Sequence, residues 1–106
     1  MTSRTMLRRL RKGDDPLTVS IQKWEDIVKG TGKDEGRYNC ALCTLFYIVG
    51  CFGCPVQEHT GEPRCEGTPY EDWELTNWEL IRGVESRRHC LKFARQELAF
   101  LKSLLK

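Results

Sequence analysis

The sequence predicts a small, mainly α-helical single domain, in which three helices surround a cysteine-rich, zinc-binding loop region with little or no β-structure. Three observations support this fold class. The chain has 106 residues, the size of one domain. Apolar residues recur at helical spacing on both sides of a central segment. Five of the six cysteines lie between Cys40 and Cys65, and a domain this small gains much from a metal staple.

Composition places the chain among globular proteins, since 40% of its residues are hydrophobic and 30% are charged. The charge-free stretch 39–57 contains Gly50, Gly53, Pro55 and four cysteines, so we expect no membrane-spanning helix, which needs about 20 apolar residues. The Arg-rich start is not followed by the apolar region of a secretory signal, so we expect a cytoplasmic protein. Clustered cysteines in a reducing compartment are typical of metal sites.

Residues 1–13 are expected to form a flexible basic arm, because Met6, Leu7 and Leu10 are the only apolar side chains after Met1. Its candidate partner-binding residues are Arg8, Arg9 and Arg11. An arm that lies on nucleic acid is the alternative interpretation. The domain proper is expected to span residues 14–106.

The first helix is predicted over residues 14–30. Asp15 is a favourable N-cap, Pro16 suits the first helical position, and Gly30 is a favourable helix end. Apolar side chains recur between them at spacings of four, three and four: Leu17, Ile21, Trp24 and Val28. Residues 30–38 are glycine-rich and charged, which predicts a loop.

The cysteine-rich segment, residues 39–66, is predicted to bind metal. Two C-x-x-C pairs and a fifth cysteine give five candidate ligands, of which four are expected to bind zinc: Cys40, Cys43, Cys51, Cys54 and Cys65. A full helix over 41–49 would place its ends about 12 Å apart, so we expect a folded-back loop or a single turn there. The apolar run 45–49 is expected to form a small core beside the metal.

Other interpretations of these cysteines stay open. Four thiolates also bind iron–sulfur clusters, although the compact three-cysteine motif of ferredoxins is missing. The spacing from Cys51 through Cys54 and His59 to Cys65 is one residue longer than that of the zinc knuckles that bind single-stranded nucleic acid. Cys90, outside the cluster, is expected to be a semi-buried thiol in a helix.

Residues 68–106 are predicted to be helical. Thr68-Pro69-Tyr70-Glu71 is a capping box with proline at the first helical position, and Gly83 is a possible kink or end. A seven-residue rhythm of apolar side chains follows: Val84, Leu91, Ala94, Leu98, Leu101 and Leu105. We expect this stripe to pack on the first helix and on Trp73 and Trp78, with homodimerisation through its excess width as the next possibility.

Charge is unevenly distributed along the chain. Residues 58–79 contain seven acids and the single base Arg64, whereas the segment from Ile81 to Lys106 is rich in bases. The candidate partner-binding residues on the last helix are basic: Arg87, Arg88, Lys92 and Arg95. Such segregation permits internal pairing or an anionic partner, and a membrane surface is a further possibility.

Several motifs resemble a group of small cysteine-rich proteins found in tailed phages and prophages. They are S-I-x-K-W-x-x-I at 20–27, N-C-A-L-C at 39–43, G-C-P-V at 53–56, T-G at 60–61, C-x-G-T-P-Y at 65–70 and F-L-K-S-L-L at 100–105. The resemblance implies a phage accessory gene, expressed in the host cytoplasm. It also implies that Cys65 belongs to the core pattern, which raises the ligand set Cys40, Cys43, Cys54 and Cys65.

We therefore expect a non-enzymatic, zinc-stabilised binding protein that docks on a host or phage macromolecule, most readily a protein, and modulates host machinery or a defence system. The alternative is a nucleic-acid-binding protein that uses the basic arm and the basic last helix. A thiol or zinc enzyme comes third, because thiolates are in surplus whereas a catalytic zinc keeps a coordination position open.

Overall fold

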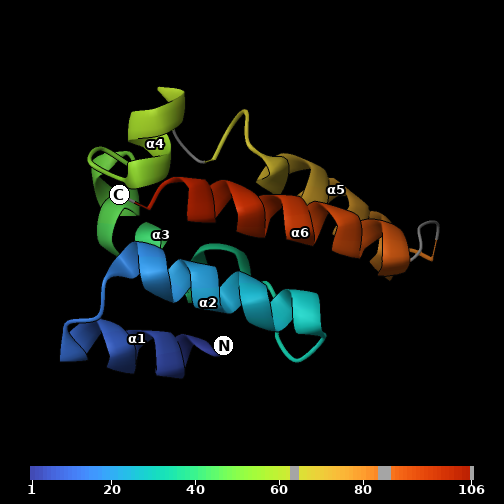
Figure 1. The fold of residues 1–106 in the computed structure, drawn as a ribbon, viewed down its shortest axis with the longest axis horizontal. Helices are drawn as coiled ribbons and strands as arrows, with labels where there is room; N and C mark the ends of the chain where they lie inside the picture. The colour runs from blue at the N-terminus through green and yellow to red at the C-terminus, as the bar shows by residue number, and fades with distance from the viewer. Residues whose placement is uncertain (63–64, 84–86, 106) are drawn as a thin grey trace.

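The computed structural model describes residues 1–62, 65–83 and 87–105, and within these ranges every regular element is a helix. Six α-helices and two short 3-10 helices follow one another along the chain (Figure 1). They are α1 (Ser3–Lys12), α2 (Pro16–Lys29), η1 (Gly36–Asn39), α3 (Ala41–Phe46), η2 (Tyr47–Val49), α4 (Pro55–Thr60), α5 (Pro69–Ile81) and α6 (Arg87–Ser103). The mainly α fold class is confirmed, but the prediction of three helices is wrong.

Helices α2 and α5 begin where the sequence predicts, although at α5 the Thr68 side chain bonds the Tyr70 amide and not the Glu71 amide of a capping box. The Asp15 carboxylate accepts a hydrogen bond from the Thr18 N–H at 3.0 Å, and the Thr68 hydroxyl accepts one from the Tyr70 N–H at 3.3 Å. These side chains satisfy amides that an isolated helix leaves without partners. Gly30 ends α2 in the left-handed conformation at φ 84°, which favours glycine.

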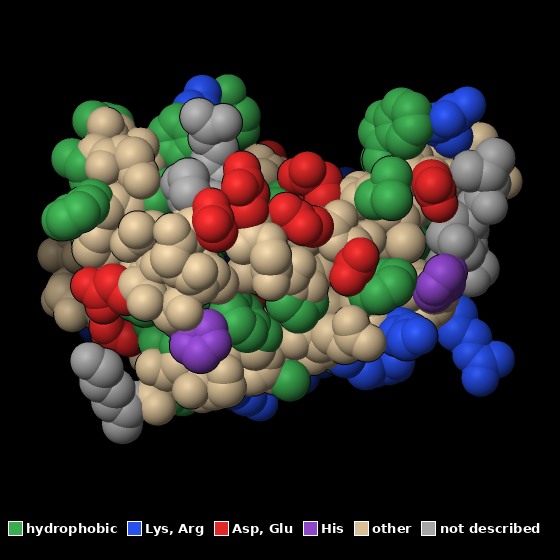
Figure 2. All heavy atoms as spheres, turned by 90° about the horizontal axis from the view of Figure 1, so that it is seen from above, with side chains coloured by type: hydrophobic (Ala, Val, Ile, Leu, Met, Phe, Trp, Pro, Cys, Tyr) green, Lys and Arg blue, Asp and Glu red, His purple; other side chains and the backbone are tan. Residues whose placement is uncertain are grey.

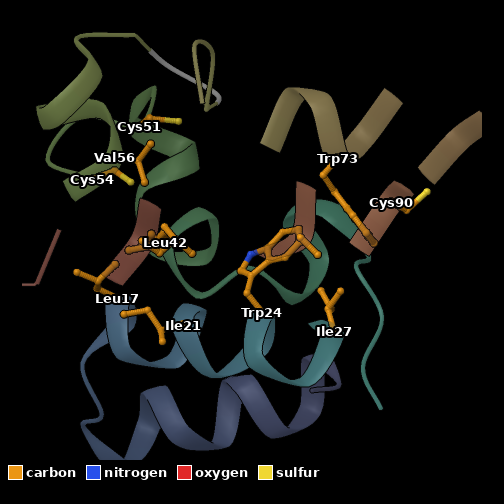
Figure 3. Close-up of a cluster of buried hydrophobic side chains, with 12 residues drawn as sticks. Leu17, Ile21, Trp24, Ile27, Leu42, Cys51, Cys54, Val56, Trp73 and Cys90 are labelled. Carbon is orange, nitrogen blue, oxygen red and sulfur yellow. The ribbon is translucent and has the colours of Figure 1, made fainter. Parts of the chain in front are cut away.

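Helices α2, α5 and α6 build the core. Helix α6 packs against both α5 and α2 along its length (Figure 1). Trp24 on α2 lies at the centre of the packed side chains, edge-on to Trp73 of α5 with ring centroids 5.4 Å apart (Figure 3). Leu17, Ile21 and Ile27 of α2 extend this cluster along the helix, as the apolar spacing predicts.

The apolar stripe on α6 packs within the chain, as expected. Ala94 and Leu101 are buried and Leu98 is half-buried, whereas Leu105 lies beyond the end of the helix and is 51% exposed. Of the two tryptophans expected to meet this stripe, Trp73 belongs to the same buried cluster as Ala94 and Leu101, whereas Trp78 is 55% exposed. Three residues used in the sequence analysis lie outside the described residues: Arg64, Val84 and Lys106.

The expectation of a flexible arm differs from the structure, because residues 3–12 form α1. The Thr2 hydroxyl accepts a hydrogen bond from the Thr5 N–H at 3.2 Å and caps the helix. Met6 is only 1% exposed and packs with Val19 and Ala41. One well-placed methionine therefore anchors a segment whose apolar content is too sparse to predict packing.

Asp34, in the loop after α2, joins three parts of the chain. Its carboxylate accepts hydrogen bonds from the Lys23 Nζ at 2.9 Å, the Gly36 N–H at 2.9 Å, the Tyr70 hydroxyl at 3.0 Å and the Trp73 Nε1–H at 2.9 Å. Burial alone would raise the pKa of Asp34, but the Lys23 charge and the donated hydrogen bonds outweigh it and lower the pKa. This buried hub ties α2, the loop and α5 together.

Within the ranges that the structure describes, no helix combines the length and the apolar character that crossing a membrane requires. The predicted absence of a membrane-spanning helix thus agrees with the described part of the fold.

Candidate metal centre

Five cysteines, all those between residues 40 and 65, line one cavity of about 260 Å³. They come from the start of α3, the turn after η2, the start of α4 and the turn before α5. They are Cys40, Cys43, Cys51, Cys54 and Cys65. Since separate segments of the chain deliver these thiols to one space, the cavity is the candidate site for a metal.

The first cysteine pair lies at the start of α3. Cys40 occupies the N-cap position, and its Sγ accepts a hydrogen bond from the Cys43 N–H at 3.2 Å. Helix α3 ends at Phe46, and the chain then reverses, with the Cys51 N–H donating to the Phe46 carbonyl at 2.8 Å. The sequence predicts a folded-back loop or a single turn between the two pairs, and this differs from the structure, in which residues 41–49 are helical as α3 followed by the 3-10 helix η2 before the chain reverses at Gly50.

The second pair lies on a tight turn that leads into α4. The Cys54 N–H donates to the Cys51 carbonyl at 3.0 Å, and Gly53 adopts φ 88° between them. Cys51 at φ 65° and Cys65 at φ 62° also have left-handed backbone conformations, which residues other than glycine adopt uncommonly. The chain therefore holds two of the cavity's thiols in strained conformations, as is frequent at functional sites.

The expected small core from residues 45–49 is wrong. Phe46 is partly buried and lines the cavity, but Leu45 is 49%, Val49 60% and Ile48 93% exposed. The 3-10 helix η2 turns the chain at this point, so Ile48 and Val49 are exposed, whereas Tyr47 lines the cavity. Leu42, Val56 and the α2 side chains supply the apolar wall in their place (Figure 3).

The thiols have unequal acidities in the metal-free protein. A hydrogen bond from the Cys43 thiol, which outweighs the effect of burial, lowers the pKa of Cys40 to about 6, and the nearby Lys23 charge contributes. The same interaction raises the pKa of Cys43. Burial raises the pKa of Cys65 to about 12. Metal binding by several of these thiols would therefore release protons.

The five thiols are donors that suit a thiophilic metal, but the structure does not hold them in the arrangement of a ligand sphere. Among the described residues, no three Cys, His, Asp or Glu side chains are already gathered as a metal ligand sphere. Zinc would draw four sulfurs to about 2.3 Å from the ion. The cysteine side chains that line the cavity would have to come together around the ion to form such a ligand sphere.

Two polar side chains at the cavity were not predicted. In the described part of the chain, Ser20 Oγ and Glu97 Oε2 are the buried side-chain oxygens without a hydrogen-bond partner, and both residues line the cysteine cavity. Burial raises the pKa of Glu97 to about 7. A sequence signal existed, because Glu97 falls on the same helical face as Ala94 and Leu101.

The raised pKa of Glu97 predicts a pH dependence of stability. A carboxyl group whose pKa is higher in the folded protein costs stability as pH rises from its ordinary range through 7. In metal-free protein, Glu97→Gln should therefore increase the free energy of unfolding by about 2 kcal/mol near pH 8, with little gain near pH 4.5. Urea unfolding at both pH values measures this, with the exposed Glu58→Gln as control. Equal gains at both pH values would contradict it.

The predicted basic partner-binding residues lie on two separate helices. Arg8 and Arg11 are exposed on α1, but Arg9 Nε donates to Asp14 at 2.9 Å. The other four are exposed on α6: Arg87, Arg88, Lys92 and Arg95. Both helices pack against α2, and α2 lies between them (Figure 1). The two basic groups therefore do not form one continuous surface.

Two further candidates lie apart from the cavity. His59 on α4 packs edge-on against Phe100, with ring centroids 5.6 Å apart, and does not line the cavity. Cys90 is 1% exposed, and its Sγ donates to the Thr76 carbonyl at 3.2 Å between α6 and α5. It is therefore more deeply buried than the sequence suggests, and it is separate from the five clustered thiols.

Comparison of the chain with protein-family models, curated proteins and solved structures found no match. The class of protein is therefore argued from the cavity, the residues that line it and the surrounding surface.

Proposed function

We propose that the protein is a non-enzymatic binding protein in which zinc, held by four of the five clustered cysteines, fixes the helices that contact a partner. The convergence of five thiols on one cavity carries this proposal. Thiolates are preferred zinc ligands, and a structural site uses four of them. Cys51 and Cys54 also belong to the core cluster, so a metal held there would brace the core directly.

The ligand set is proposed to include Cys65 with three of the remaining four cysteines. Its left-handed backbone directs a thiol to the cavity from the turn that precedes α5. A metal bound to Cys65 and to Cys40 would link the start of α5 to the start of α3. An iron–sulfur cluster is the alternative cofactor, favoured by a cavity of about 260 Å³, which is larger than one ion requires.

The partner is proposed to be a protein of a host cell or a phage. The motif resemblance to small phage and prophage proteins supports an accessory role, in which binding modulates host machinery or a defence system. Exposed apolar side chains support a protein partner: Ile48 is 93%, Phe52 77% and Ile81 76% exposed. Larger exposed apolar patches mark interaction sites on soluble proteins.

Nucleic-acid binding is the second candidate function, and the exposed Arg8 and Arg11 on α1 favour it. Capture from lysate, together with binding to heparin and oligonucleotides, distinguishes protein binding from nucleic-acid binding. Protein binding predicts capture of a protein from nuclease-treated host lysate, with no retention on heparin or oligonucleotides at about 50 mM salt. Tight oligonucleotide binding that weakens steeply with salt, without a captured protein, would overturn the leading proposal.

A further inference from the structure

Helix α5 carries an apolar stripe that nothing in the described fold covers. Leu75 is 58%, Trp78 55% and Ile81 76% exposed, while Trp73 and Thr76 on the same helix are buried. Spacings of three residues keep the exposed side chains on neighbouring parts of the solvent face. The Arg82 guanidinium lies 4.7 Å from the Trp78 ring centroid, a pairing of two residue types enriched at interfaces.

Acidic side chains accompany this stripe. Glu71, Asp72 and Glu74 are exposed on the first turns of α5, and Glu66 is exposed just before it. None of these four forms an ion pair within the described residues. Figure 2 shows Asp and Glu side chains gathered in the middle of this face, with hydrophobic side chains at both ends of its upper edge. The first half of this face therefore carries acidic side chains without ion-pair partners, and the basic Arg82 lies at its far end beside Trp78.

We propose that the solvent face of α5 binds a basic amphipathic segment of a partner protein. Lysine or arginine side chains of that segment would lie against Glu71 and Glu74, and its apolar side chains would cover Leu75 and Trp78. This inference rests on the proposed binding function and names the chemistry of the partner. The acidic side chains of the face favour a protein as the partner, because negative charge repels nucleic-acid phosphates and anionic lipids.

A second copy of the chain is the competing occupant. Helix α1 exposes Arg4, Leu7 and Arg8, which give it a basic surface with one exposed apolar residue. It lies on the side of the molecule away from α5 (Figure 1). Contact between these two different surfaces is head-to-tail and, unless it closes a ring, extends into a filament. A complex of fixed size that contains one copy of the chain would therefore indicate a separate partner protein and not a second copy.

The test uses a defined probe, a fluorescent helical peptide of lysine and leucine, with a glutamate–leucine peptide of equal length for comparison. Zinc-loaded wild-type protein should bind the lysine peptide and not the glutamate peptide. Trp78→Ala and Glu74→Lys should each weaken binding by about tenfold or more. The matched controls Tyr38→Ala and Glu58→Lys make the same types of change at exposed positions on η1 and α4, outside α5, and should bind as wild type does.

Equal effects of the α5 variants and the controls would overturn the inference, and so would an oligonucleotide that competes for this face. Concentration-dependent self-association that Trp78→Ala abolishes would overturn it in favour of a second copy. Circular dichroism shows that each variant is folded before it is compared. Protein that holds zinc but ignores the lysine peptide refutes this surface alone, whereas protein without metal refutes the proposed function.

Discussion

Replacing Asp34 with alanine should destabilise the protein by about 3–5 kcal/mol, because it leaves the buried Lys23 ammonium without its counter-ion. The Lys23 and Asp34 side chains are 3% and 7% exposed, so water cannot replace the lost partner. The same change removes the acceptor of the Tyr70 hydroxyl and the Trp73 indole. Urea unfolding of the metal-loaded protein measures the loss of free energy of unfolding.

The matched control is Asp14→Ala, which breaks the ion pair with Arg9 at the surface. Exposed ion pairs contribute little, so this variant should unfold close to wild type. The lowered pKa of Asp34 adds a pH signature: its contribution is present at neutral pH and is lost as pH falls through that pKa. Equal unfolding midpoints for Asp34→Ala and Asp14→Ala would show that the hub contributes nothing.

Removal of the metal is expected to have the largest effect. Structural zinc sites bind with about 10–16 kcal/mol at neutral pH, and this binding free energy is coupled to folding. A strong chelator under reducing conditions should therefore loosen α3, α4 and the turn at Cys65, and it should lower the thermal midpoint by well over 10 °C. Hydrogen exchange resolves the effect by segment, with the α2–α6 contact as the internal reference.

A chelator that changes neither the thermal midpoint nor the exchange of residues 40–65 would contradict a structural role for the metal. Restoring zinc should recover both quantities. Cadmium or cobalt added in place of zinc should also recover the fold, with spectra typical of thiolate ligands.

The helix caps and apolar spacing were sufficient to predict α2, the start of α5 and the fold class. Capping is local, so Asp15 and Thr68 act through amides two or three residues away. The α1 helix was missed because its anchor, Met6, depends on Val19 and Ala41, which are distant in sequence. Long-range packing of this kind overrides weak local patterns.

The cysteine cluster was predictable from spacing. The helical period could have placed Glu97 on the buried face of the last helix, but not at the cavity. Glu97 belongs to α6 and Ser20 to α2, and only the packing of these helices brings them to the cavity. Asp34 lies in a segment predicted only to be a charged loop, yet its carboxylate bonds both Lys23 of α2 and Trp73 of α5. The outward direction of Ile48 follows from the η2 turn, which apolar composition alone does not reveal.

Four of the five clustered thiols are proposed to hold a metal. Metal analysis of protein purified under reducing conditions tests it, together with single Cys→Ser variants at 40, 43, 51, 54 and 65, and Cys90→Ser as control. Wild-type protein should carry a single zinc ion per chain, which is lost in four of the five variants and kept in the fifth and in the control. Wild-type protein that carries no bound metal under these conditions would contradict it.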